Sequence, residues 1–75
     1  MPHVIVKLYP GRTEEQKENM TERFVQAVIE CLGAPETSVS VSFEEVDKER
    51  LKEEVYLPDI VEKENTLYRK PGYQL

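Results

Sequence analysis

The chain has 75 residues, of which 39% are hydrophobic and 33% are charged, and its net charge at pH 7 is −5. An acidic chain without a basic block does not favour nucleic acid as a partner, and no run is long or apolar enough to span a membrane. A single Cys and a single His exclude an intrachain disulfide and a zinc-ligand cluster. The sequence therefore predicts one small domain over residues 1–75, expected to be cytoplasmic because no signal peptide is present.

A first strand is predicted over residues 3–9, which are rich in β-branched and aromatic side chains. Apolar residues occupy both odd and even positions of this run, so both faces of the strand are expected to be covered. Pro10 and Gly11 then predict a turn.

A long helix is predicted over residues 13–32. Thr13 and Gln16 have the spacing of a capping box, and Gly33 followed by Pro35 is typical of a helix end. An apolar stripe at helical spacing is expected to face the core, and it places the lone cysteine there: Met20, Phe24, Ala27, Val28, Cys31 and Leu32.

A second strand is predicted over residues 39–46, with Val39, Val41 and Phe43 facing the core. A strand, a helix and a strand joined by short connections predict parallel pairing. The fold class is therefore α/β (α+β), a single β-α-β unit followed by a helical C-terminal tail.

The tail is predicted to begin with a helix that Asp47 caps and that carries Leu51 and Val55 on one face. Pro58 is expected to break or restart this helix, and a second set of apolar residues has helical spacing: Ile60, Val61, Leu67 and Tyr68. One β-α-β unit leaves a sheet face and strand edges open, and a short chain without metal or disulfide needs extra burial. A homodimer is therefore the smallest expected assembly.

The second residue is a candidate catalytic group. Methionine before a small residue is normally removed in cells, which would leave Pro2 with a free secondary amine. Such an amine titrates near ~8, and a positive neighbour or an apolar pocket lowers that value toward neutrality. The alternative interpretation is that Pro2 merely follows the start codon.

Several motifs occur together at the spacing of a known family. Pro2 opens a strand, and it is followed by Gly11-Arg12-Thr13-Glu14-Glu15-Gln16-Lys17 and by Ala34-Pro35-Glu36-Thr37-Ser38-Val39-Ser40-Val41. Over roughly residues 2–46 the chain resembles the 4-oxalocrotonate tautomerase superfamily. The Pro-His start and the Lys-Pro-Gly-Tyr end (residues 70–73) resemble its longer, dimeric members, which ketonise phenylpyruvate-type enols.

The resemblance implies roles for four residues. Pro2 would be the general base, and Arg12 would bind the substrate carboxylate; the alternative for Arg12 is a solvated surface charge. Ser40 occupies the position of a second active-site arginine, which places dicarboxylate substrates in doubt unless Arg50, Arg69 or Lys70 compensates. Leu51 occupies the position of an active-site phenylalanine and would retain an apolar wall, to which Phe43 or Tyr56 could add.

Taken together, these patterns predict a cofactor-free and metal-free tautomerase that acts on small 2-oxo acids or their enols with an apolar or aryl group. A non-catalytic homo-oligomeric binding module and a hydratase or dehalogenase on the same scaffold are the alternatives. His3 is interpreted as a packed or surface strand residue rather than a catalytic one. Tyr56 and Tyr73 are either packing residues or pocket residues at a dimer interface.

Overall fold

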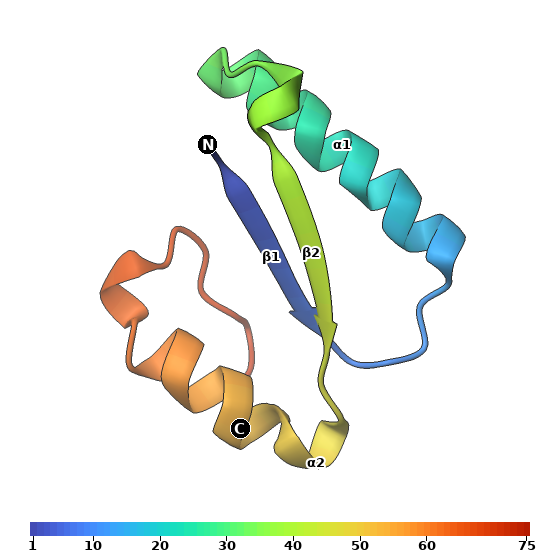
Figure 1. Ribbon diagram of the computed structural model, residues 1–75. Coiled ribbons are helices and arrows are strands. Elements are labelled where there is room, and N and C mark those ends of the chain that lie inside the picture. Colours follow the sequence, from blue (N-terminus) through green and yellow to red (C-terminus); the bar gives the residue numbers. More distant parts are fainter. The chain divides into compact units, whose positions relative to one another are not determined.

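Two parallel strands and one helix form the first unit, Met1–Glu45, of a computed structural model that describes residues 1–75 (Figure 1). Its elements are β1 (His3–Leu8), α1 (Glu14–Leu32), the short 3₁₀ helix η1 (Glu36–Ser38) and β2 (Ser40–Glu45). The strands pair in parallel, with His3 opposite Ser40 and Leu8 opposite Glu45. The predicted β-α-β order and parallel pairing are confirmed, with each strand one or two residues shorter than expected.

Both ends of α1 follow from local sequence signals. The Thr13 hydroxyl accepts a hydrogen bond from the Gln16 backbone N–H at 3.1 Å, and the Gln16 side chain accepts one from the Thr13 N–H at 2.9 Å. At the other end Gly33 is left-handed, with φ of 68°, and its N–H donates to the carbonyl of Ile29. The capping box and the glycine stop are both confirmed.

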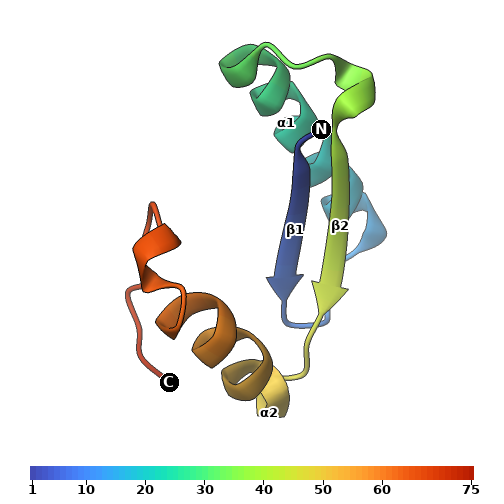
Figure 2. The ribbon, with the colours of Figure 1, turned by 60° about the vertical axis from the view of Figure 1, so that its left-hand side comes forward.

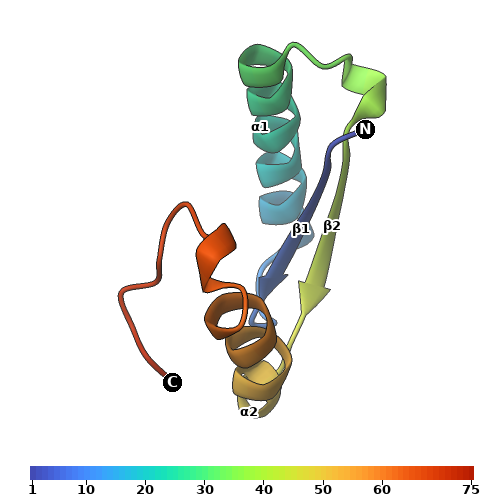
Figure 3. The ribbon, with the colours of Figure 1, turned by 90° about the vertical axis from the view of Figure 1, so that its left-hand side faces the viewer.

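The helix α1 runs beside the strands in the opposite direction and covers only one face of the sheet (Figures 2 and 3). Side chains of β1 alternate between exposed and half-buried, with Val4, Val6 and Leu8 half-buried. Ile5 lies on the other face and is 51% exposed. The expectation that both faces are covered is therefore wrong for the single chain.

The buried stripe of α1 is rotated relative to the predicted one. Cys31 is exposed, and Leu32 is 70% exposed, so the prediction that they belong to the core is wrong. Only Phe24 and Val28 of the predicted stripe are half-buried, together with residues on the adjoining side of the helix: Thr21, Val25 and Ile29. Because α1 has apolar residues on both sides of Phe24 and Val28, spacing alone did not decide which side meets the sheet.

Lys17 connects α1 to β2, and this contact gives a pH-dependent prediction. Its ammonium donates to the Glu45 carboxylate at 3.1 Å and lies 3.6 Å from Glu14. The hydrogen bond to Glu45, followed by the charges of Glu45 and Glu14, raises the pKa of Lys17 above its ordinary value of 10.5, against a smaller opposing effect of desolvation.

A group that binds its proton more tightly in the folded state stabilises the fold below its unfolded pKa and loses that contribution as the pH rises through the folded pKa. Glu45→Gln should therefore have a lower free energy of unfolding than the wild type at neutral pH. This difference should shrink at pH values above 10.5. Denaturant titrations at one fixed protein concentration measure it. A difference that stays constant across this range would contradict the role of the pair.

The second unit, Val46–Leu75, contains the remaining helices. The helix α2 (Lys48–Leu51) continues directly into η2 (Lys52–Val61), which is wound as a π-helix, and the 3₁₀ helix η3 (Glu64–Thr66) follows. Asp47 is the N-terminal cap residue by position, but its side chain makes no capping hydrogen bond.

Two predictions for this tail are wrong. Pro58 lies inside η2 and does not break it. Proline removes an N–H and clashes with the carbonyl four residues earlier, and wider bonding, such as Glu62 N–H to the Leu57 carbonyl at 2.9 Å, is compatible with it. Leu67 and Tyr68 lie beyond the last helix rather than on a helical face.

Burial is slight throughout the chain. Val46 is the one buried residue, at 7% exposure, and no residue of the first unit is buried. None of the helices combines the length and the apolar composition that crossing a bilayer requires. A unit without a fully buried side chain still has apolar surface to cover, and association is one way in which small domains cover it.

Candidate active site

Arg12 lies in the segment between β1 and α1, immediately before the N-cap residue Thr13. The capping box and the bond from the Lys17 N–H to the Thr13 carbonyl at 3.1 Å fix the backbone that follows Arg12. Arg12 is exposed, and no acidic side chain pairs with it. An unpaired guanidinium beside a helix N-terminus is a favourable position for binding a carboxylate.

Arg12 lines a pocket of about 510 Å³ between α1 and the strands, which we call the arginine pocket. Leu8, Met20 and Phe43 give it apolar walls, and its polar lining residues carry no negative charge: Arg12, Gln16, Lys17, Asn19 and Arg23. Because Lys17 is neutralised by Glu45, the two arginines are the cations of this pocket without a partner. A pocket of one charge sign in a chain of net charge −5 attracts anions.

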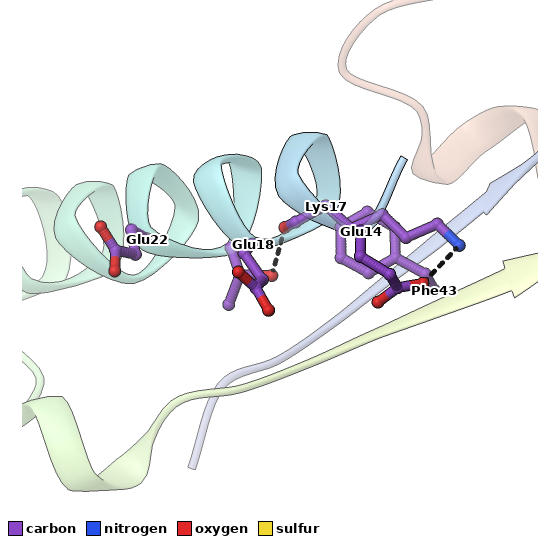
Figure 4. A pocket seen from close by; sticks show the side chains of 6 residues that line it. Glu14, Lys17, Glu18, Glu22 and Phe43 are labelled. Atoms are coloured by element: carbon purple, nitrogen blue, oxygen red, sulfur yellow. Dashed lines mark hydrogen bonds and ion pairs between the residues drawn. The ribbon is translucent and has the colours of Figure 1, made fainter. Parts of the chain in front are cut away.

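A second pocket of similar size, the acidic pocket, also involves α1 and has the opposite charge (Figure 4). Glu14, Glu18 and Glu22 line it, and Lys17 and Phe43 are shared with the arginine pocket. Three carboxylates repel an anionic ligand, and Lys17 already contacts Glu14 at 3.6 Å. Of these two pockets, the arginine pocket is therefore the one suited to an organic acid.

Pro2 directly precedes β1, whereas Arg12 follows the other end of this strand. It is half-buried, its carbonyl accepts a hydrogen bond from the Ser40 N–H at 3.1 Å, and Met1 before it is 96% exposed. Pro2 and Leu8, at the two ends of the strand, are roughly 20 Å apart at a rise of about 3.3 Å per residue. Pro2 and Arg12 of one chain therefore do not meet.

Ser40 lies at the start of β2, next to the N-terminus. Its hydroxyl is 2.7 Å from Nδ1 of His3, which stands opposite it in the sheet register. This contact was missed in the sequence, because aligning the two predicted strands from their first residues pairs His3 with Val39, one residue before the observed partner Ser40. The Ser40 hydroxyl is thus held by His3.

Leu51 ends α2 in the second unit and is half-buried. Tyr56 and Tyr73 pack against each other in that unit, with ring centroids 6.1 Å apart and ring planes inclined by 33°. Two of the cations considered as replacements for the missing arginine are paired: Arg50 with Glu54 at 3.2 Å and Lys70 with Glu64 at 2.9 Å. No group of three or more His, Cys, Asp or Glu side chains is arranged to hold a metal ion.

Comparisons with known proteins agree with the motifs. A family model described as "Tautomerase enzyme" matches residues 2–52. A protein named Tautomerase PptA from Cronobacter sakazakii is 37% identical over 76 aligned positions, covering all of both chains, and one from Pectobacterium atrosepticum is 40% identical over 97% of both.

Shorter relatives match about two thirds of the chain at higher identity. A 2-hydroxymuconate tautomerase from Bacillus subtilis is 47% identical over 65% of this chain and 79% of its own length. A crystal structure described as YwhB, a homologue of 4-oxalocrotonate tautomerase, is 47% identical and covers 63% of this chain and 77% of its own, with a TM-score of 0.60. About two thirds of this chain therefore shares its fold with a solved homologue of 4-oxalocrotonate tautomerase.

Proposed function

Because the chain belongs to the tautomerase family, whose activity is that of an isomerase, we propose that it interconverts the enol and keto forms of 2-oxo acids with an apolar or aryl group. The observation that carries this substrate class is the arginine pocket, where the unpaired Arg12 lies beside apolar walls formed by Leu8, Met20 and Phe43. A guanidinium binds the carboxylate, and the walls accept the apolar group.

The proposed base is the nitrogen of Pro2 after removal of Met1. With Met1 attached this nitrogen is an amide and is not basic. As a free amine it accepts the proton of the enol hydroxyl while the 2-oxygen forms a carbonyl, and the electron pair of the carbon–carbon double bond then takes the proton back at carbon 3. Arg12 stabilises the charge that develops on the oxygen, and atoms and charge balance without a cofactor.

The distance between Pro2 and Arg12 in one chain supports a site made by two copies. Each strand of the two-stranded sheet has one unpaired edge. Antiparallel pairing of β1 with β1 of a second copy would place the start of one strand beside the end of the other. Pro2 of one copy would then reach the arginine pocket of its partner, and the pairing would cover an exposed edge.

Membership of the longer, dimeric branch is part of the same proposal. The relatives named PptA align with the whole chain, including the tail, whereas the shorter relatives align with about two thirds of it. The resemblance further assigns Leu51 as an apolar wall residue and Ser40 as a neutral contact to the substrate in place of an arginine.

Ketonisation of phenylenolpyruvate, followed by the loss of its ultraviolet absorbance, tests the function with Met1-free protein. We expect the rate to rise in proportion to enzyme concentration above the buffer-catalysed reaction. A rate equal to the buffer rate would contradict the function and favour the alternative of a non-catalytic binding module.

Mixing two strongly impaired forms tests the shared site. A copy that retains Met1 and a copy with Arg12→Ala each lack one half of every site, but a mixed dimer contains one intact Pro2–Arg12 pair. Random reassociation should restore about a quarter of wild-type activity, since half of the dimers are mixed and each has one of two sites. Reassociated mixtures that stay as inactive as the separate forms would show that the two residues do not act across copies.

A further inference from the structure

We propose that Arg23 is a specificity-determining residue that binds a second anionic group of the substrate, a proposal that rests on the function proposed above. Arg23 lies in the middle of α1 and lines the arginine pocket together with Arg12. No acidic side chain pairs with it, and none lines the pocket. Both exposed guanidinium groups therefore line one pocket without an acidic partner, which leaves both available to an anion.

The two arginines are spaced for two groups of one small molecule. Glu14 and Arg23 are nine residues apart on α1, which is roughly 14 Å along a helix that rises 1.5 Å per residue. Arg12 precedes the helix, so the two side chains enter the pocket from positions separated by about that distance. Leu8, Met20 and Phe43 form apolar walls of the same pocket.

The ligand that matches this arrangement has an enol acid at one end, a short apolar or aryl body, and a carboxylate, sulfonate or phosphate at the other end. Substrates with two anionic groups were in doubt because Ser40 stands where the resemblance implies a second arginine, which left Arg12 as the one arginine at a matching position. Arg23 supplies a second cation from the helix rather than from the strand. Arg50 and Lys70 are already paired with Glu54 and Glu64, which leaves them less suited to this role.

Two substrates that differ in one group test the proposal. Phenylenolpyruvate has one anionic group, and its para-carboxy derivative has two. We expect Arg23→Gln to lower the ratio of kcat/KM for the dianion to kcat/KM for the monoanion about 10-fold, since one charged hydrogen bond is lost for the dianion alone. Glutamine is a good helix former, so α1 should be retained.

Arg50→Gln is the matched control, because it removes the same charge from a residue that Glu54 already neutralises; it should leave the ratio unchanged. A ratio that stays the same in Arg23→Gln, or that falls equally in Arg50→Gln, would overturn the proposal and leave the tautomerase function intact.

Binding measured without turnover separates this proposal from the function on which it rests. The unreactive analogues are 3-phenylpropanoate and its para-carboxy derivative, titrated calorimetrically into protein with and without Arg23→Gln. We expect the dianion to bind about 10-fold more weakly to the variant than to the wild type, while the monoanion changes less. If the protein ketonises neither enol but shows this weaker binding, the anion site stands and the tautomerase function is rejected. Equal affinities of wild type and Arg23→Gln for the dianion would reject the role of Arg23.

Discussion

Replacing Arg12 by alanine should lower kcat/KM for enol ketonisation by ~10- to 150-fold without unfolding the protein, because a charged hydrogen bond to an anion contributes about 1.5–3 kcal/mol. Arg12 is exposed and makes no ion pair, so its removal breaks no contact that holds the fold together. The capping box that begins α1 uses Thr13 and Gln16 and remains complete.

The control for this change is Arg12→Lys, which keeps the positive charge and loses the planar guanidinium. A lysine forms a single point contact where arginine binds a carboxylate through two parallel N–H groups, so an intermediate kcat/KM is expected. Circular dichroism confirms the fold of each variant. Equal kcat/KM for wild-type and Arg12→Ala protein would show that Arg12 is a solvated surface charge.

The elements of the first unit were predictable because their signals are local. The capping box of Thr13 and Gln16 and the left-handed Gly33 need only a few residues on either side, and the order strand, helix, strand predicts the parallel pairing. The helix stripe was less predictable. Cys31 and Val25 lie on different sides of Phe24 and Val28, and the packing of α1 on β2 decides which side is covered.

The tail and parts of the site depend on contacts that sequence spacing does not contain. Pro58 was expected to break or restart a helix, but it lies inside η2, which is wound as a π-helix. Arg23 reads in sequence as a solvated charge on a helix, and only the folded chain brings it to the same pocket as Arg12. Likewise the hydrogen bond between His3 and Ser40 follows from the strand register rather than from either residue alone.

Retention of Met1 should reduce ketonisation nearly to the buffer rate, because acylation converts the Pro2 nitrogen from a base into an amide. In the trimmed protein, kcat/KM should rise with pH along a limb that lies below about 8, the reference for an α-amino group. The direction of the pKa shift follows from the environment proposed for the amine. The positive charge of Arg12 and burial beside apolar walls both favour the neutral amine and lower its pKa. Pro2→Ala would retain a primary amine in a similar place, so partial activity is expected there.

The most direct measurement compares two preparations of identical sequence, one with Met1 and one without, whose N-termini are verified by mass spectrometry. Both are assayed for phenylenolpyruvate ketonisation at the same protein concentration, so that the degree of association is the same. The account predicts that the trimmed protein is active and that the protein with Met1 is not. Equal rates for the two preparations would contradict it and remove Pro2 from the mechanism.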